Sequence, residues 1–114
     1  MRNTRPIVWM KAARRDFEDF PDGAREKLLD ALTIVAEGGM PFIAKPLIGF
    51  GSGVLELALS FRGDAFRMIC AVLLGPDVWV VHAFQKKSKS GIKTPKQELD
   101  LIDVRLRRVK EMLK

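Results

Sequence analysis

The spacing of apolar residues predicts a strand and two helices in the first third of the chain. Residues 7–10 (Ile-Val-Trp-Met) form a short apolar run that suits a strand, and residues 11–19 suit a short helix. From Ala24 to Glu37, apolar residues recur every three or four positions, which is the pattern of one face of an amphipathic helix. Gly38 and Gly39 are expected to end that helix.

The middle of the chain carries the pattern of consecutive strands. Leu55, Leu57 and Leu59 alternate with other residues, so residues 54–59 are predicted to be a strand with one apolar face. Residues 66–74 and 78–84 are predicted to be two further strands, because turn residues lie at 62–64 and 75–77. Short strands joined by tight turns favour an antiparallel meander.

The end of the chain has the pattern of a long helix. Thr94, Pro95 and Gln97 have the spacing of a helix start, with a hydroxyl N-cap, proline at the first position and glutamine three residues after the cap. An apolar stripe then runs to Leu113. The predicted order is β-α-α-β-β-β-α, an α+β fold of two layers with a small, mainly antiparallel sheet packed on helices. The length of 114 residues predicts one domain, 1–114.

Positive charge is concentrated at the end of the chain. Residues 85–114 contain ten Lys or Arg and four Asp or Glu, whereas residues 1–84 contain ten of each. The formal net charge of +6 therefore lies in the last quarter of the sequence. Cations that follow an apolar strand directly favour a polyanionic partner, most simply nucleic acid.

The composition argues against several other classes of protein. Cys70 is the only cysteine, so no internal disulfide can form and the reducing cytoplasm is the expected location. The longest apolar runs are far too short for a membrane span, so no membrane partner is expected. One histidine, one cysteine and no clustered carboxylates predict neither a metal site nor a cofactor.

The order of elements and several motifs together resemble the RelE/HigB-type toxins of bacterial toxin–antitoxin pairs, in particular their phage-related branch. The lysine segment HAFQKKSKSG at 82–91, followed by Thr94 and Pro95, is the specific part of this resemblance. Weaker matches complete it: AKPLIG at 44–49, LEL at 55–57, FR at 66–67 and RL at 105–106. Together they extend over nearly the whole chain from about residue 7.

The resemblance implies a RelE-like fold and a metal-independent endoribonuclease that cuts messenger RNA in the ribosomal A site. The nucleophile would be the 2′-hydroxyl of the RNA. A cognate antitoxin, often a helix-turn-helix protein, would hold the enzyme inactive. Such an attack needs cations that neutralise the crowded phosphate, and a proton acceptor and a proton donor on either side.

The sequence offers candidates for these roles. Arg67, Lys86 and Lys87 are predicted to stabilise the phosphate, and His82 is the candidate proton carrier because it alone titrates near neutral pH. Further predicted RNA contacts are Lys45, Lys89, Lys93, Lys96 and Phe66. Plainer interpretations stay open: Arg67 as a surface residue of the sheet, His82 as a packed histidine, and the lysines as solvated charge.

Three residues depart from the pattern of the phage-related branch. Ala58 stands where an arginine is usual, and Phe66 and Cys70 stand where tyrosines are common. The missing cation and hydroxyl groups favour a second hypothesis, a catalytically impaired toxin-like module that binds RNA or an antitoxin. A third hypothesis is an RNA- or DNA-binding regulatory domain.

Overall fold

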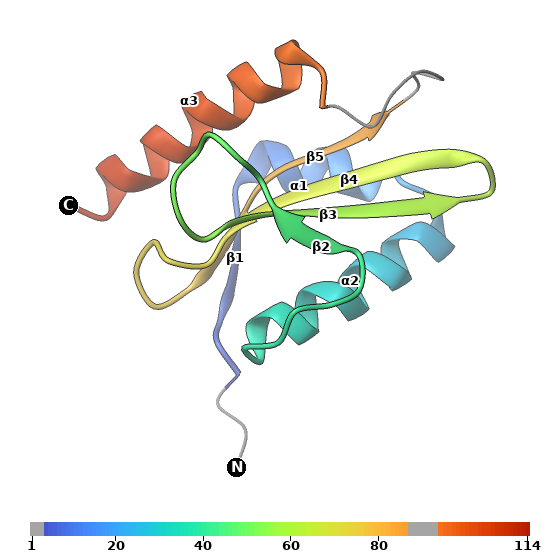
Figure 1. Ribbon diagram of the computed structural model, residues 1–114, viewed down its shortest axis with the longest axis horizontal. Helices are drawn as coiled ribbons and strands as arrows, with labels where there is room; N and C mark the ends of the chain where they lie inside the picture. Colours follow the sequence, from blue (N-terminus) through green and yellow to red (C-terminus); the bar gives the residue numbers. More distant parts are fainter. Residues whose placement is uncertain (1–3, 87–93) are drawn as a thin grey trace.

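The computed structural model describes residues 4–86 and 94–114, which form one five-stranded sheet and three helices (Figure 1). In chain order the elements are β1 (Ile7–Trp9), α1 (Lys11–Glu18), α2 (Asp22–Ala36), β2 (Ala44–Pro46), β3 (Val54–Phe61), β4 (Asp64–Ala71), β5 (Val78–Lys86) and α3 (Lys96–Met112). The predicted α+β fold with a mainly antiparallel sheet is confirmed.

The strands follow the order β1-β5-β4-β3-β2 across the sheet. Strands β2 to β5 pair antiparallel, whereas β1 pairs parallel with β5, so that Ile7 lies beside Val78. Strand β2 was not predicted from the sequence, because it has only three residues and ends in Pro46. A proline is tolerated there because β2 is an edge strand.

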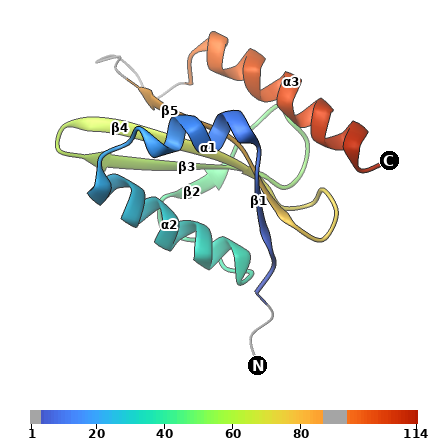
Figure 2. The same ribbon diagram turned by 180° about the vertical axis from the view of Figure 1, so that it is seen from behind.

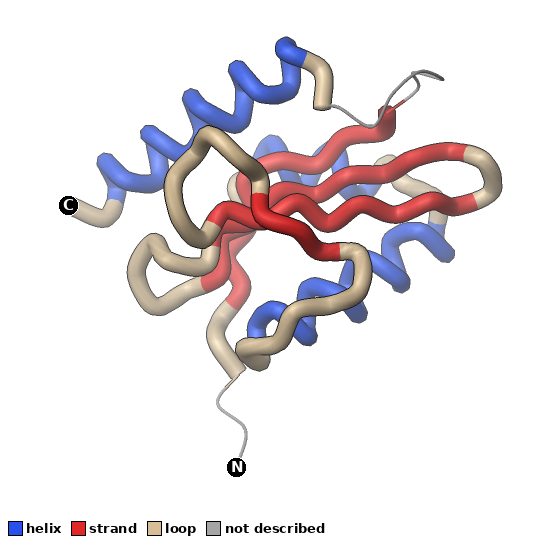
Figure 3. The backbone as a smooth tube through the Cα atoms, viewed as in Figure 1, coloured by secondary structure: helices blue, strands red, loops and turns tan. Residues whose placement is uncertain are grey.

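The two faces of the sheet bury separate clusters of apolar side chains. Helices α1 and α2 cover one face, as Figure 2 shows, and α3 packs across the other (Figure 3). Alternate residues of β3 and β4 supply the first cluster, among them Leu55, Leu57, Phe66 and Met68. The second cluster joins the sheet to α3 through Val54, Ile69, Ala71, Val81, Ile102, Leu106 and Val109.

The hairpin between β3 and β4 fixes the register of the site described below. Its two turn residues, Arg62 and Gly63, have φ angles of 52° and 86°. Positive φ at both central residues is the requirement of a type I′ turn, whose twist matches that of the flanking strands. The turn pairs Phe61 with Asp64 and thereby places Ala58 opposite Arg67.

The start of α3 differs from its prediction in one respect. Pro95 is the N-cap residue, and no side chain caps the helix. The Thr94 hydroxyl instead donates a hydrogen bond to the Glu56 carboxylate on β3, at 2.7 Å. The Glu56 carboxylate is buried and would lose free energy without a hydrogen-bond donor. The backbone N–H groups at the start of α3 are exposed and can bind water instead. No helix within the described ranges is long and apolar enough to cross a membrane.

Candidate functional site

Charged side chains meet on the sheet face that α3 covers only in part. Across this face, Arg67 pairs with Ala58 on one side and with Phe84 on the other. Paired residues point to the same side of a sheet, so the neighbouring rows bring Glu56 and Lys86 to the same face as Arg67. Arg67 therefore lies at the centre of a group of polar and small side chains, the Arg67 cluster, whose charged members are Lys45, Glu56, Arg67 and Lys86.

Arg67 and Glu56 form a buried ion pair in this cluster. Only 7% of Arg67 and 1% of Glu56 is exposed, and the Arg67 Nη1 atom lies 3.2 Å from Glu56 Oε1. The Nζ atom of Lys45 on β2 is 3.5 Å from the same oxygen, and Thr94 donates to the other oxygen. A buried charge must be paired, and here one carboxylate is shared by two cations and a hydroxyl.

The Arg67 guanidinium keeps hydrogen-bonding capacity that this arrangement does not use. Its Nε and Nη1 atoms are buried and have no hydrogen-bond acceptor within residues 4–86 and 94–114. The Nη1 contact with Glu56 is an ion pair without hydrogen-bond geometry. A guanidinium with free N–H groups matches the oxygens of a phosphate, which accept two parallel hydrogen bonds.

Lys86, the last residue of β5, extends the positive charge of this cluster. It is buried and pairs across the sheet with Ala65. Burial lowers the pKa of Lys86, the nearby positive charges of Arg67 and Lys45 lower it further, and the Glu56 carboxylate raises it. The direction of this shift makes Lys86 a better proton donor near neutral pH than an ordinary lysine.

His82 lies in the next part of the same strand but has partners of its own. Its Nδ1 atom is 2.6 Å from Nη1 of Arg105 on α3, and its Nε2 atom is 2.6 Å from Glu98 Oε1. Because arginine can only donate, Nδ1 is the acceptor, and Nε2–H donates to Glu98. His82 is therefore neutral in this arrangement. Burial, the largest cause, lowers the pKa of His82.

A cavity gives access to the Glu56 end of the cluster. It lies between β2 and the start of α3, and its lining includes Lys45, Glu56 and Thr94. Beside Arg67, the small side chains Ala58 and Ala65 are only half-buried. The described part of this face therefore combines cations, one carboxylate and room for a substrate.

The structure brings some predicted site residues together and separates others. Arg67, Lys86 and Lys45 share the cluster, whereas Lys96 is exposed and forms an ion pair with Asp100 at 3.0 Å. The predicted residues outside the described ranges are Lys87, Lys89 and Lys93.

Phe66 lies on the opposite face of the sheet from Arg67. It is 1% exposed and its ring centroid is 4.9 Å from that of Phe20, in the core beneath α1 and α2. A ring in this position is not available to stack on RNA, and that role is dropped. Cys70 also lies in this core, where burial raises its pKa to about 12. Of the three departures from the toxin pattern, Ala58 alone faces the cluster.

Two residues of the site were absent from the sequence candidates. The sequence indicates Glu56 only as part of the Leu-Glu-Leu motif, and Thr94 only as a helix cap and as part of the Thr-Pro pair of the family resemblance. A carboxylate between two buried leucines can indicate a buried charged site, but it is equally typical of a residue on the solvent-exposed face of a strand. Among the described residues, no group of three His, Cys, Asp or Glu side chains is arranged to hold a metal ion.

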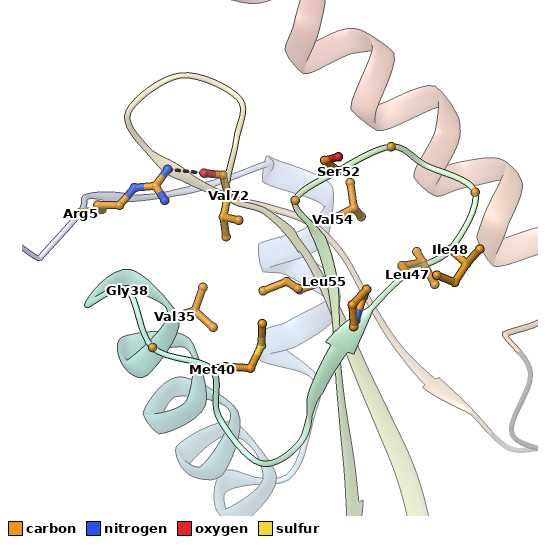
Figure 4. A pocket seen from close by; sticks show the side chains of 15 residues that line it. Arg5, Val35, Gly38, Met40, Leu47, Ile48, Ser52, Val54, Leu55 and Val72 are labelled. Atoms are coloured by element: carbon orange, nitrogen blue, oxygen red, sulfur yellow. Dashed lines mark hydrogen bonds between the residues drawn. The ribbon is translucent and has the colours of Figure 1, made fainter.

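A second cavity, between α2 and the loop that joins β2 to β3, has a different character (Figure 4). Its walls are largely apolar, with Val35, Met40 and Leu55 among them. The one cation in its lining, Arg5, donates to three backbone carbonyls, of which that of Val72 is 2.7 Å away. With its cation held by the backbone, this cavity has no charged group free for an anionic substrate.

Comparison with known families gives one match. A family model described as phage derived protein Gp49-like (DUF891) matches residues 15–107. The matched range includes Lys45, Glu56, Arg67, Lys86 and Thr94. No curated protein matches the chain.

Proposed function

The chain belongs to the family of phage-derived Gp49-like proteins, which is associated with the toxins of toxin–antitoxin pairs, and we propose that it is a toxin that cuts messenger RNA on the ribosome. In this proposal the partners are messenger RNA in the ribosomal A site and a cognate antitoxin, in many pairs a helix-turn-helix protein. The proposal needs neither a metal ion nor a cofactor.

One observation carries the proposal: a buried arginine with unused N–H groups lies beside a buried carboxylate and a lysine on one face of the sheet. The guanidinium of Arg67 would bind the non-bridging oxygens of the scissile phosphate. Lys86 adds a second cation, and Lys45 a third at the edge. Cations fixed in a buried site stabilise the negative charge that develops during attack on a phosphodiester.

The cluster also contains the groups that the proton transfers require. Glu56 would take the proton of the 2′-hydroxyl, and that oxygen would attack the phosphorus. The bond from phosphorus to the 5′-oxygen would break, which leaves a 2′,3′-cyclic phosphate. Lys86 would give a proton to the departing 5′-oxygen.

His82 remains the alternative proton carrier. Its one acceptor nitrogen, Nδ1, is occupied by Arg105, and Nε2 carries the proton that it donates to Glu98. The Glu56 oxygen that accepts from Thr94 has a second lone pair, and this supports Glu56 as the acceptor. The further proposed RNA contacts are Lys87, Lys89, Lys93 and Lys96, which follow Lys86 in the sequence.

Induced expression tests the proposal in cells. The wild type should arrest growth and leave cut messenger RNA, whereas Arg67→Ala and Lys86→Ala should each reduce cleavage about a hundredfold or more. Arg14→Ala is the matched control, because Arg14 is an exposed cation on α1, outside the cluster. Cleavage by purified Glu56→Gln and His82→Gln, each first shown to be folded by circular dichroism, then separates the two candidate proton acceptors.

Normal growth with soluble, folded wild-type protein would contradict the nuclease proposal. It would favour the second hypothesis, a module that binds RNA or an antitoxin without cleavage. The observation in favour of that hypothesis is Ala58, which leaves the position directly opposite Arg67 without the usual second arginine.

A further inference from the structure

A groove with an apolar floor and a basic rim lies between α1 and the second half of α3. It is separate from the Arg67 cluster, which meets α3 at the other end, near Thr94. The view in Figure 2 shows α1 and α3 on neighbouring sides of β5. This groove has no part in the chemistry proposed above.

The floor of the groove consists of large apolar side chains. Trp9 pairs with Val80 and Trp79 with Val8, so the two tryptophans come from opposite faces of the sheet at its β1 edge, and both line the groove. Both are half-buried, and Met112 is 55% exposed. The indole Nε1–H of Trp79 is buried and has no acceptor within residues 4–86 and 94–114. The groove therefore offers apolar contact area next to a buried indole N–H that lacks an acceptor within those residues.

The rim of the groove is positive. All the charged residues in its lining are cations: Lys11, Arg15, Arg105 and Arg108. Asp16 lies outside the lining, 3.5 Å from the Arg15 guanidinium, and Arg15 is largely exposed in this pair. Burial, the largest cause, lowers the pKa of Arg105; Asp16 raises it, and repulsion from Arg15 and Arg108 lowers it further.

We infer that this groove binds an acidic, amphipathic helical segment of a protein partner, with its aliphatic side chains on the floor and its carboxylates on the rim. Cationic rims attract and orient an acidic chain, and the apolar floor supplies contact area for a helix laid in a groove. The inference rests on the proposed function, because a toxin of this kind requires an antitoxin. It assigns that partner a site away from the Arg67 cluster.

The composition of the floor favours a peptide over RNA. Single-stranded RNA binds through bases that stack on open aromatic faces. Here Trp9 and Trp79 are half-buried, and the apolar lining also includes Met10 and Met112, whose flexible side chains adapt to aliphatic partners. Binding of RNA in the groove is the competing outcome that the experiment must detect.

The tryptophans make the groove measurable without a label. The chain has two tryptophans and no tyrosine, and both tryptophans line this groove. The probe is a short synthetic helix without tryptophan, with leucines on one face and glutamates beside them. Its control carries lysines in place of the glutamates, and a single-stranded RNA oligonucleotide is the third ligand. Because Trp9 also lines a neighbouring groove, the titration is repeated in Trp9→Phe, where Trp79 is the only emitter.

Charge reversal on α3 tests where the probe binds. Arg108→Glu reverses a residue of the rim, and Arg107→Glu is the matched control, since Arg107 is exposed on the same helix but outside the groove. The Arg107 pair with Asp103 is an exposed one of small energetic value, so its loss does not disturb the comparison. The acidic probe should change the Trp79 emission in a saturable way, and Arg108→Glu should weaken its binding about tenfold while Arg107→Glu leaves it within about twofold.

Equal losses in the two variants, or equal binding of the acidic and the basic probe, would overturn the inference. A saturable change of emission with RNA and none with the acidic probe would assign the groove to nucleic acid instead. Failure of growth arrest and RNA cleavage would refute the proposed nuclease but would leave this titration unchanged, so the two results are separable.

Discussion

Arg67 and Glu56 depend on each other at the centre of the candidate site. Each is almost fully buried, and removal of Glu56 leaves the Arg67 guanidinium as an uncompensated charge, whereas removal of Arg67 leaves Glu56 with Lys45 and Thr94 alone. This dependence holds the guanidinium at a fixed place on the sheet, with two buried nitrogens that no acceptor within residues 4–86 and 94–114 uses. The same contact that supports the proposed chemistry is therefore also part of the stability of the fold.

Replacement of Glu56 by glutamine should destabilise the folded protein strongly. Glu56→Gln removes the charge that compensates Arg67 and Lys45, and loss of one partner of a buried pair costs about 3–5 kcal/mol. The free energy of unfolding in urea measures this cost. Asp100→Asn is the matched control, because it makes the same chemical change in an exposed pair with Lys96, worth about 0–1 kcal/mol. Equal effects of the two changes would show that the Glu56 pair contributes no more than a surface contact.

The sequence identifies the cations of this site more readily than their partner. Arg67 stands out because it interrupts an apolar strand, and Lys86 because it opens the lysine segment. Glu56 does not stand out, since alternation with leucines predicts only that it lies on the other face of its strand. Pairing with β4 and the return of the chain at Thr94 bury that face, and both are tertiary effects. For Phe66 the sequence led to a wrong prediction, an RNA contact on the open face of the sheet. Its neighbours in the strand are Ala65 and Arg67, and this pattern does not show which face of the sheet Phe66 occupies.

Helix α3 is tied to the sheet by polar contacts at two places along its length. Thr94, just before the helix, binds Glu56 on β3, and Arg105 binds the carbonyl oxygen of Val81 and the ring of His82 on β5. Glu98 accepts the other ring proton of His82. These two contacts of α3 require a neutral His82, which accepts a hydrogen bond from Arg105 and donates one to Glu98.

The attachment of α3 should weaken in acid. Burial holds the pKa of His82 below its ordinary value of 6.5, so between these two values the unfolded chain binds more protons than the folded one. The contribution of His82 to stability is complete above about pH 6.5 and is lost as the pH falls through this window. Melting temperatures measured from about pH 8 to pH 5 should fall more steeply for the wild type than for His82→Gln, which has no titrating ring. Parallel curves would show that His82 keeps its ordinary pKa.

At the scale of elements, the periodicity of apolar residues predicted the longer helices and strands but did not predict the three-residue strand β2. The strands and helices with clear alternation or helical spacing were all found, at nearly their observed limits. Strand β2 has three residues, too few to show a period, and its pairing with Leu55 to Leu57 is set by β3. The cap of α3 was assigned to Thr94 because local spacing cannot reveal a buried carboxylate thirty-eight residues earlier in the chain.

On the scale of the whole molecule, the described residues bring several cations together at two separate places: the Arg67 cluster and the rim of the groove beside α3. The sequence places the excess charge in the last quarter of the chain but does not predict this division. Arg67 belongs to the balanced part of the sequence and joins Lys86 only through the pairing of β4 with β5. Lys11 and Arg15 likewise join Arg108 through the packing of α1 beside α3.

The salt dependence of RNA binding should reveal a phosphate contact at the Arg67 cluster. Each phosphate neutralised on single-stranded RNA contributes about −0.7 to the slope of log affinity against log salt concentration. Arg67→Ala should therefore make the slope shallower by about 0.7, because one phosphate contact is lost. Arg14→Ala should leave it unchanged, since Arg14 is an exposed cation outside both places. An equal change of slope in both variants would indicate diffuse attraction without a phosphate site at Arg67.

The parallel pairing of β1 with β5 joins parts of the chain that are far apart in sequence. Ile7 has its partner at Val78, and a contact between such distant positions forms late because a long loop must close first. Lys86 and Thr94 come later still along the chain. A chain that emerges from the ribosome in order therefore cannot assemble the Arg67 cluster until Thr94 has emerged. The topology thus makes the cluster a late product of folding, later than any contact within α1 and α2.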